Sequence, residues 1–301
     1  MPRTTRTFNL LSFLLFVMVC GGSWFNFVSC STISPVNSIR YTPASFTSIE
    51  AVEPQWQLFA DGIDYFYGTI TSPRLEFYAL KIDLQSPDIG IVVKAGAVNG
   101  SNSTSTRVSS FVRDNDLIAG INAVPFDVVS SREGQPIKNM GIVVSGGELF
   151  APVNVHYDAL VFYTDGTAAI VSQSSINSTE NIKNAVGGFH KILINGEPAE
   201  RTFDRDARHP RSAAGISADG KYLYLLVIDG RSAGSVGATE KETSSILRLL
   251  GSWNGINLDG GGSSALVIRF PDGIRVVNTP VHRFSGQERA VAGCLGIYIK
   301  N

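Results

Sequence analysis

One stretch of this chain decides its fold: Asn257-Leu258-Asp259-Gly260-Gly261-Gly262-Ser263-Ser264-Ala265-Leu266-Val267. In an extended strand, Asn257 and Asp259 share one face, while Ile256 and Leu258 point the other way, into a core. The three glycines that follow allow a ligand to approach the backbone closely. A tight turn between two strands needs fewer glycines than this, so the pattern favours a functional loop.

Composition limits the class of protein. The chain has 301 residues, 44% of them hydrophobic and 17% charged, which is typical of a globular protein with one large domain or two small ones. Its net charge of −1, with no basic cluster outside the N-terminus, argues against a nucleic-acid partner. Thirty glycines, many of them in polar–glycine pairs between apolar runs, indicate a strand-rich fold.

The N-terminus has the pattern of an export signal. Arg3 and Arg6 precede an apolar run over residues 10–19, as in a secretory signal. Phe27-Val28-Ser29-Cys30 resembles a bacterial lipobox in which Cys30 would be lipidated, although phenylalanine replaces the usual leucine. The alternative is an uncleaved anchor that extends to Val28. Both alternatives predict an exported protein, either anchored in the cell envelope or secreted, with residues 1–30 as the targeting segment.

The cysteine count fits the lipoprotein interpretation better. With Cys20 removed and Cys30 acylated, Cys294 alone remains, so no disulfide can form. Cys294 lies in an apolar run and is interpreted as a buried structural residue. Residues 31–54 are rich in Ser, Thr and Pro and predict a tether. Residues 55–301 then form a single folded domain.

The patterns after residue 55 predict an α+β (mixed α/β) fold, with a strand-rich mixed sheet and covering helices. Apolar alternation or apolar runs predict strands at residues 78–84, 89–93 and 117–122, and helical spacing predicts a short helix at 108–112. Glycine-containing turns between apolar runs predict hairpins at Gly146-Gly147, Asp165-Gly166, Asp219-Gly220 and Pro271-Asp272-Gly273.

A strand–helix–strand unit connects two aspartates. The unbroken apolar run up to Asp229 predicts a central strand that is buried on both faces. A capping box, Thr239-Glu240-Lys241-Glu242, starts a helix that Gly251 ends. If the unit is a right-handed crossover, Asp229 and Asp259 end neighbouring parallel strands at one edge of the sheet.

Several segments, in this order along the chain, resemble the phosphodiester glycosidase family. The segments are Gly120-Ile121-Asn122, His209-Pro210-Arg211-Ser212-Ala213-Ala214-Gly215-Ile216, Val227-Ile228-Asp229-Gly230-Arg231, Gly237-Ala238-Thr239, Asn257 to Ser264, and Glu288-Arg289-Ala290-Val291. The family usually has glycine and aromatic residues after the asparagine of the first segment. This chain has Ala123-Val124-Pro125 there, so its pocket differs locally.

The resemblance implies hydrolysis of the bond between a sugar's anomeric carbon and a phosphodiester, with an N-acetylglucosamine-1-phosphodiester-like substrate. Phosphate leaves as a stable anion, so protonating it matters less than in an ordinary glycoside. The reaction needs a carboxylate near the oxocarbenium ion, for which Asp259 and Asp229 are the candidates. It also needs cations for the phosphate, and arginine binds phosphate bidentately. Arg211 is the first candidate for this role, and Arg231 and Arg289 are the next candidates.

The same motifs supply candidates for substrate binding. The backbone N–H groups of residues 260–263 can form an anion-binding nest. His209 is either a general acid or a surface residue before Pro210, while Asp229 can instead cap a turn and Arg211 can instead form a structural ion pair. The predicted substrate-binding residues are Asn122, His209, Gly230, Arg231, Gly260, Gly261, Gly262, Ser263, Ser264 and Arg289.

Cofactors and partners follow from the same residues. His156, His190 and His282 are scattered without metal-ligand spacing, so we expect no cofactor, although carboxylates and carbonyls leave calcium or magnesium open. The expected partners are a sugar-phosphate diester or glycan, and a membrane through the N-terminal lipid or anchor. The alternative function is a non-catalytic envelope lipoprotein that binds glycans or cell-surface polymers. The paired carboxylates favour the enzyme, because binding alone does not need them.

Overall fold

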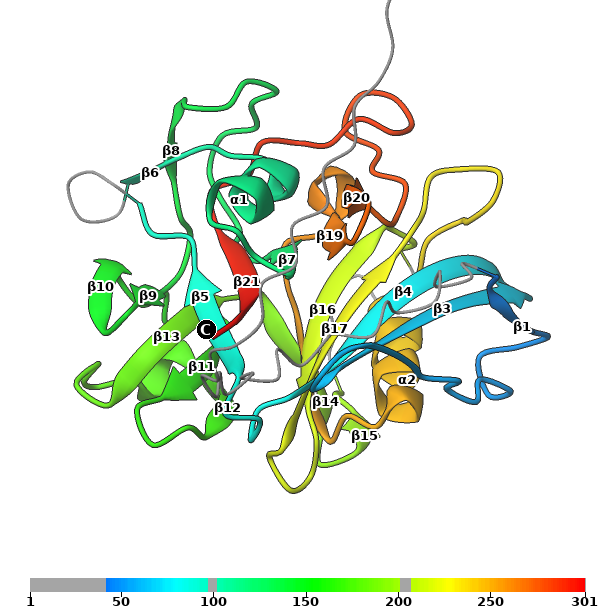
Figure 1. Cartoon of the computed structure of the whole chain (residues 1–301), viewed down its shortest axis with the longest axis horizontal. Helices are drawn as coiled ribbons and strands as arrows, with labels where there is room; N and C mark the ends of the chain where they lie inside the picture. The colour runs from blue at the N-terminus through cyan, green and yellow to red at the C-terminus, as the bar shows by residue number, and fades with distance from the viewer. Residues whose placement is uncertain (1–41, 97–101, 201–206, 301) are drawn as a thin grey trace, which may run out of the picture. The chain divides into compact units, whose positions relative to one another are not determined.

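The computed structural model describes residues 42–96, 102–200 and 207–300. This part of the chain is mostly β-strand, in mixed sheets, with two α-helices, α1 (Val108–Asp114) and α2 (Glu240–Leu250), and two short 3-10 helices, Gln173–Ser175 and Gly261–Ser263 (Figure 1). The strand-rich mixed architecture was predicted, but helices contribute less than an α+β label implies. The predicted signal segment with Cys30, and residues 31–41 of the tether, lie outside the described residues.

The largest sheet contains the strands that begin at Arg211 (β16) and that end just before Asp229 (β17) and at Asn257 (β18). Its path is β1-β3-β4-β17-β16-β18-β14-β15, with β2 paired to β3, and β1 joins β3 in parallel while the other pairs are antiparallel. The strands are β1 (Ala44–Phe46), β2 (Gln57–Ala60), β3 (Ile63–Thr71), β4 (Arg74–Asp83), β14 (His190–Ile194), β15 (Glu197–Pro198), β16 (Arg211–Ile216), β17 (Tyr222–Ile228) and β18 (Asn254–Asn257). The predicted central strand is β17, and it is apolar on both faces as expected.

The predicted crossover is wrong in one respect. β17 and β18 run in the same direction, but β16 lies between them and is antiparallel to both. Arg211 at the start of β16 pairs with Ile228, and Ala213 pairs with Asn257. The hairpin that joins β16 to β17 places β16 beside β17, so β18 takes the next position. The ends of β17 and β18 still reach the same edge of the sheet, with the start of β16 between them.

Two smaller sheets and a ribbon complete the described chain. One sheet contains β20 (Gly273–Val276), β19 (Leu266–Phe270), β7 (Ala119–Asn122), β21 (Cys294–Ile299) and β5 (Ile89–Val93), in that order. The other contains β10 (Glu148–Ala151), β9 (Val143–Ser145), β13 (Ile182–Gly187), β11 (Asp158–Tyr163) and β12 (Ala168–Ser172), and β6 (Asn102–Thr104) pairs with β8 (Pro136–Lys138). All four predicted hairpin turns are confirmed, because they join β9–β10, β11–β12, β16–β17 and β19–β20.

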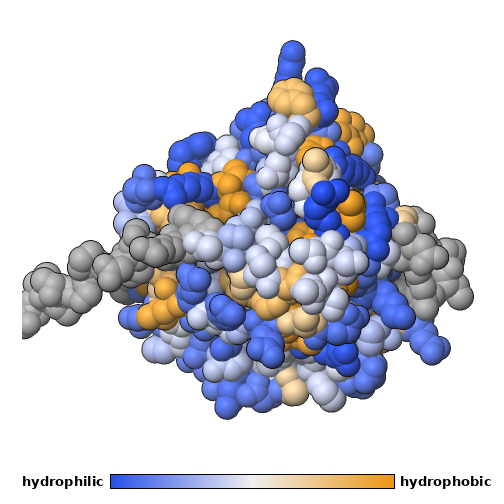
Figure 2. Space-filling model, turned by 90° about the vertical axis from the view of Figure 1, so that its right-hand side faces the viewer, coloured by the Kyte–Doolittle hydropathy of each residue, from blue (hydrophilic) through white to orange (hydrophobic). Residues whose placement is uncertain are grey.

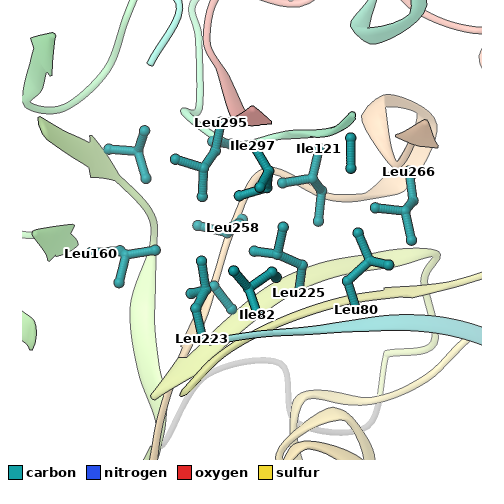
Figure 3. Close-up of a cluster of buried hydrophobic side chains, with 14 of the residues drawn as sticks. Leu80, Ile82, Ile121, Leu160, Leu223, Leu225, Leu258, Leu266, Leu295 and Ile297 are labelled. Atoms are coloured by element: carbon teal, nitrogen blue, oxygen red, sulfur yellow. The ribbon is translucent and has the colours of Figure 1, made fainter. Parts of the chain in front are cut away.

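The main core lies between the large sheet and the two smaller ones. In Figure 3, Ile82, Leu223 and Leu225 of the large sheet face side chains of the smaller sheets, among them Ile121, Leu160 and Leu295. Each fully buried side chain of this kind contributes about 1.5–3 kcal/mol. Leu258 sits within this cluster, and Ile256 and Leu258 are both fully buried as predicted. Burial of Leu258 therefore fixes where the next residue, Asp259, leaves the sheet.

Helix α2 covers the opposite face of the large sheet (Figure 1). The capping box is confirmed: the Glu242 N–H donates to Thr239 Oγ1 at 3.1 Å, and the Thr239 N–H donates to Glu242 Oε2 at 2.9 Å. Gly251 ends the helix at φ 115°, a left-handed conformation that glycine adopts readily. The helix thus begins just after the bridge between Ala238 and His209, beside the start of β16.

The folded domain begins earlier than predicted. β1 (Ala44–Phe46) pairs with β3, and Ile49 and Val52 are buried in the core. The tether prediction is therefore wrong for residues 44–54, because Ser/Thr/Pro composition does not reveal a three-residue strand at a sheet edge.

Among the described residues no helix is long and apolar enough to span a membrane. On the face shown in Figure 2, apolar side chains lie in small groups among hydrophilic ones.

Candidate active site

Three loops meet at the sheet edge where β17 and β18 end and β16 begins. The first loop continues β17 through residues 229–231, and the second continues β18 through residues 259–263. The third runs from residue 278 to residue 289, between β20 and β21. Pro210, just before β16, accepts a hydrogen bond from the Gly261 N–H at 2.8 Å, so the second loop is held against the start of that strand.

Asp259 carries the carboxylate at the centre of this site. Its N–H donates to the Ala123 carbonyl at 2.9 Å. The side chain is half-buried, and its Oδ2 atom is inaccessible and has no hydrogen-bond partner among the described residues. Burial raises the pKa of Asp259 to about 7, against the lowering effects of the Ser263 hydroxyl, the Arg289 charge and the Gly260 N–H. A carboxyl group with this pKa can exchange a proton near neutral pH.

Asn122 holds the two ends of the glycine loop. Its Nδ2 donates to the main-chain carbonyl of Asp259, and its Oδ1 accepts from Ser212 Oγ at 2.7 Å and from the Ala265 N–H at 3.1 Å. The residue is fully buried. Because the protein itself uses these polar atoms, the geometry gives Asn122 a supporting role beneath the loop rather than the predicted contact with substrate.

The predicted anion nest is largely closed. The N–H groups of Gly261, Ser263 and Ser264 donate to main-chain carbonyls of Pro210, Gly260 and Gly261 respectively. Gly261 has φ 61°, which explains why glycine is favoured there. The loop is therefore a compact turn whose backbone bonds are internal, and ligand recognition falls to the side chains around it.

The central cation of the site is Arg289. Its Nη1 donates to Ser263 Oγ at 3.1 Å, and its Nε donates to His282 Nδ1 at 3.0 Å. A Cβ on Gly262 would collide with this guanidinium, so the second role of the glycines is to give it space. Burial lowers the pKa of Arg289, whereas the charge of Asp259 raises it. Arg289 is thus held next to Asp259, with Ser263 in contact with both.

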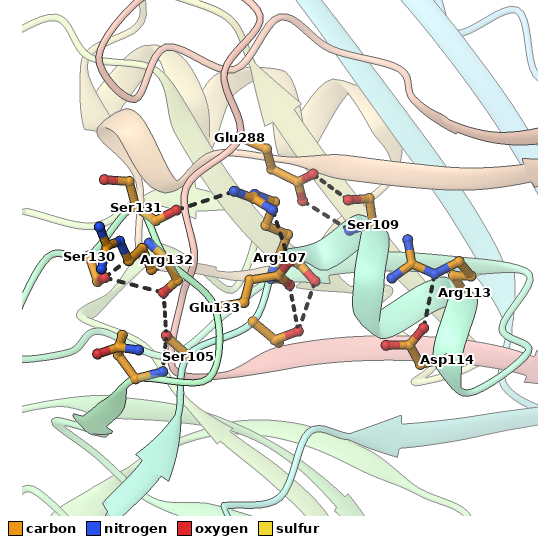
Figure 4. A network of polar contacts seen from close by, with 12 residues as sticks. Ser105, Arg107, Ser109, Arg113, Asp114, Ser130, Ser131, Arg132, Glu133 and Glu288 are labelled. Atoms are coloured by element: carbon orange, nitrogen blue, oxygen red, sulfur yellow. Dashed lines mark hydrogen bonds and ion pairs between the residues drawn. The ribbon is translucent and has the colours of Figure 1, made fainter.

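Glu288 anchors this arginine to helix α1. Its Oε1 accepts from the Ser109 N–H at 2.9 Å, and its Oε2 accepts from Ser109 Oγ at 2.6 Å (Figure 4). A carboxylate satisfies the unpaired N–H groups at a helix N-terminus. In the same network Arg107 Nη1 pairs with Glu133 Oε2 at 2.9 Å. The main chain next to Arg289 is therefore fixed on a regular element.

His282 belongs to the site, although no sequence pattern indicated that it would. Its Nδ1 accepts from Arg289, and its Nε2 is buried without a hydrogen-bond partner among the described residues. Burial lowers the pKa of His282, and the charges of Arg289, Arg283 and Arg107 lower it further. The imidazole is neutral, and because arginine only donates, the ring proton lies on Nε2. Metal-ligand spacing does not reveal a histidine that acts through an arginine.

Arg231 brings a second cation over the glycine loop. It is exposed, its Nη2 lies 3.2 Å from His209 Nδ1, and its guanidinium borders Gly261. Its backbone φ of 58° is left-handed, which is uncommon for residues other than glycine and points to function. The structure thus brings together the predicted residues Asp259, Ser263, Arg231, His209 and Arg289.

Arg211, the first choice for the phosphate, is used elsewhere. It is buried, its Nε donates to the Ala238 carbonyl at 2.9 Å, and its Nη2 donates to the Ala207 carbonyl at 3.0 Å. Its Nη1 lies 3.8 Å from Glu240 Oε1. These contacts join β16 to the start of α2. They argue for the structural alternative and against Arg211 as the main phosphate ligand.

Asp229 has a different environment from Asp259. It is buried, and its carboxylate accepts from the Thr279 N–H at 3.0 Å and from Asn278 Nδ2 at 3.1 Å. Burial raises the pKa of Asp229 to about 6, against the hydrogen bonds from Asn278 and Thr279 and with the charge of Glu76 adding to the rise. Asp229 therefore ties the end of β17 to the third loop. Sequence patterns did not identify Asn278 or Thr279.

The remaining predicted residues pack within the site. A Cβ on Gly230 would lie 2.8 Å from both Gly237 Cα and Pro210 N, so Gly230 is needed for close approach of two chain segments. Ser264 is buried, and its Oγ has no hydrogen-bond partner among the described residues.

The described residues contain no group of three or more His, Cys, Asp or Glu side chains placed to hold a metal ion.

With this geometry in place, the chain can be assigned to a class. A family model described as phosphodiester glycosidase matches residues 115–298, which include the residues of all three loops. The chain therefore belongs to the phosphodiester glycosidase family, as the motifs predicted. The reaction class of that family is the hydrolysis of phosphodiester glycosides.

Particular relatives are distant. The chain is 29% identical over 170 residues to the SPbeta prophage-derived uncharacterized protein YomE of Bacillus subtilis, a match that covers 52% of this chain and 25% of that protein. A hypothetical protein from Synechocystis has a TM-score of 0.63 at 14% identity, covering 83% of this chain and 64% of the other. The chain thus spans less than two thirds of either relative.

One structural relative has a named activity. The catalytic domain of zebrafish N-acetylglucosamine-1-phosphodiester alpha-N-acetylglucosaminidase, auto-inhibited by its pro-peptide, has a TM-score of 0.58 at 19% identity. The match covers 82% of this chain and 89% of that domain. At this level of identity the likeness shows the fold alone.

Proposed function

We propose that this protein is an exported glycosidase that hydrolyses the bond between a sugar's anomeric carbon and a phosphodiester, with an N-acetylglucosamine-1-phosphodiester-like substrate. Family membership supports the reaction class. The observation that carries the assignment is the placement of an incompletely hydrogen-bonded carboxylate beside two cations. Asp259 Oδ2 lacks a hydrogen-bond partner among the described residues, next to a loop bordered by Arg289 and Arg231.

The two arginines suit the phosphate. The charge of Arg231 lowers the pKa of Arg289, so the two guanidinium groups repel each other in the free protein. An anion between them would relieve this repulsion and accept charge-assisted hydrogen bonds. Guanidinium groups also match phosphate oxygens bidentately. We assign the non-bridging oxygens of the diester to Arg289 and Arg231.

Asp259 suits the anomeric centre. The bond from the anomeric carbon to the phosphate oxygen breaks, and the electron pair leaves with the phosphomonoester, which the arginines stabilise without a proton. Ionised Asp259 stabilises the positive charge that develops on the sugar and accepts the proton of the attacking water, whose hydroxyl bonds to the anomeric carbon. Its pKa of about 7 suits a base at neutral pH. Asp229, already hydrogen-bonded within the protein, orders the third loop.

The test is a comparison of two nitrophenyl substrates. One is a nitrophenyl phosphodiester of N-acetylglucosamine 1-phosphate, and the other is the nitrophenyl glycoside of the same sugar without phosphate. We expect formation of free N-acetylglucosamine from the diester alone, because the arginines act only on phosphate. Binding of the diester without release of sugar would support the non-catalytic alternative instead. Equal hydrolysis of both substrates would contradict the assigned role of the arginines.

A further inference from the structure

A hollow next to the candidate site has no role in the chemistry described so far. Its volume is about 260 Å³, and it is lined by Tyr65, Tyr67, Tyr78, Arg275, Val276 and Val277. The three tyrosines come from β3 and β4 of the large sheet, Arg275 and Val276 come from β20, and Val277 directly precedes the third loop. Two sheets that pack against each other thus leave a gap with aromatic walls at their edge.

Tyr67 is the aromatic wall that a ligand can reach. Its ring stacks on that of Tyr78, with centroids 4.5 Å apart and planes 10° apart. Tyr78 is buried and Tyr67 is half-buried, so one face of the pair is covered by protein and the other side lies toward solvent. Burial raises the pKa of both tyrosines, and the charge of Asp229 raises it further. Both hydroxyls are therefore neutral and able to donate and accept hydrogen bonds.

The hollow adjoins the site through the third loop. Val277 is followed directly by Asn278 and Thr279, which bind the carboxylate of Asp229. The Tyr78 hydroxyl lies 3.5 Å from Glu76 Oε2. Tyr78 of the hollow is therefore close to the carboxylates of Glu76 and Asp229, whereas the glycine loop is bordered by Arg231 and Arg289.

We propose that the tyrosine-lined hollow beside Asp229 binds an uncharged hydroxylated ring, a sugar unit of the substrate, while the arginines bind the phosphate. This proposal deepens the proposed function and rests on it. Aromatic and valine walls cover the C–H face of a sugar ring, and the tyrosine hydroxyls bind its hydroxyl groups. Arg275 in the wall of the hollow is paired with Asp272, and the carboxylates of Glu76 and Asp229 near Tyr78 disfavour an anion, so charge complementarity orients the substrate along the sheet edge.

The first measurement is of binding, not activity. Saturation-transfer NMR would follow methyl N-acetyl-α-glucosaminide on the wild type, on Tyr67→Ala and on Arg289→Lys, with Tyr163→Ala on β11 as a matched control. We expect Tyr67→Ala to weaken sugar binding by roughly 3- to 10-fold, the size of one aromatic contact. Arg289→Lys and Tyr163→Ala should bind the sugar as the wild type does. Inorganic phosphate, followed by the broadening of its ³¹P signal, should show the opposite response, with weaker binding by Arg289→Lys alone.

A second variant covers the case in which Tyr67→Ala disturbs the stack on Tyr78. Val277→Trp fills the hollow without removing a tyrosine, and it should abolish the sugar signal. If both variants remain folded and bind the sugar as the wild type does, the proposal is wrong. If they lose sugar binding in a protein that hydrolyses no diester, the hollow stands and the proposed function fails.

The position of the ring in the substrate is a separate question. The ring in the hollow is either the glycone or the aglycone of the diester. Two diesters that share the same glycone, one with a methyl aglycone and one with a sugar aglycone, distinguish these two positions. If the ring in the hollow is the glycone, Tyr67→Ala lowers kcat/KM equally for both diesters. If it is the aglycone, the variant lowers kcat/KM for the sugar aglycone alone.

Discussion

The imidazole of His282 accepts a hydrogen bond through Nδ1 from Nε of Arg289, at 3.0 Å. The same guanidinium donates through Nη1 to Ser263 at 3.1 Å. The guanidinium is planar, so two bonds from different edges fix its orientation beside Asp259. The neutral His282 thus orients the Arg289 guanidinium, and it can do so only while its Nδ1 is unprotonated.

Replacing His282 tests this positioning role. His282→Phe removes the acceptor, and we expect KM for the diester to rise by roughly 10-fold, the value of one hydrogen bond to a charged group, with a smaller change in kcat. His282→Gln keeps an acceptor and should lie closer to the wild type. Burial and the neighbouring arginines lower the pKa of His282, so the wild type should lose affinity only at acidic pH, below the usual histidine range. His282→Gln should lack this acidic loss. A His282→Phe enzyme with wild-type KM would refute the positioning role.

Arg289 and Arg211 should differ in what their removal changes. We expect Arg289→Ala to lower kcat/KM by roughly 10²- to 10³-fold, as for loss of a preorganised electrostatic group, with little loss of thermal stability because a repulsion with Arg231 disappears. Arg211→Ala should instead cost about 3–5 kcal/mol of folding free energy, as breaking a buried charge pair does, while the folded fraction keeps its kcat/KM. Thermal melts and kinetics on both variants are the measurement. A stable, inactive Arg211→Ala enzyme would restore Arg211 as the phosphate ligand.

Sequence patterns predicted what depends on neighbours in the chain. The buried run of β17, the capping box at Thr239 and the Gly-containing hairpins each follow from local periodicity or turn chemistry, and the alternation around Leu258 placed Asp259 correctly beside the core. The insertion of β16 between β17 and β18 does not follow from local pattern, because an apolar run does not specify which strand it pairs with. The contacts of Arg211 and His282 are also non-local, since both depend on which loops meet at the sheet edge.

Lipidation of the N-terminus remains a prediction from sequence. If Phe27-Val28-Ser29-Cys30 is a lipobox, Cys30 carries the acyl chain and the domain is attached to a membrane. Radiolabelled palmitate should enter the wild type and not Cys30→Ser. Cys294→Ser serves as the control, because the Cys294 thiol is buried in the fold and should not be acylated. Equal labelling of the wild type and Cys30→Ser would exclude the lipobox.

Asp229→Asn tests whether the more buried aspartate is structural. An amide nitrogen would face the Thr279 N–H, two donors toward each other, and we expect a loss of about 1–3 kcal/mol of folding free energy. The folded pKa of Asp229, about 6, lies above its usual value of 3.8. Its contribution to stability is therefore full below the usual value and lost as pH rises through about 6. The difference in thermal midpoint between wild type and variant should narrow as pH rises from 3.8 to about 6. A difference that widens over this pH range would show that the pKa of Asp229 is not raised in the folded protein.

Asp259→Asn tests the proposed catalytic carboxylate, since the amide keeps the size of the side chain and removes its charge. We expect kcat to fall by a factor on the order of 10³, as when another preorganised electrostatic group is lost. The folded pKa of Asp259 is raised to about 7 from 3.8, so the wild type loses stability as pH rises from the lower value through the higher one, whereas the amide does not titrate. The thermal midpoint of the variant should therefore equal or exceed that of the wild type above neutral pH.

Turnover of Asp259→Asn and of the wild type is measured beside the thermal melts, and wild-type kcat/KM should rise with pH as the base ionises. Near-normal turnover in Asp259→Asn would reject the catalytic role, and a collapsed midpoint above neutral pH would show that Asp259 mainly holds the glycine loop in shape.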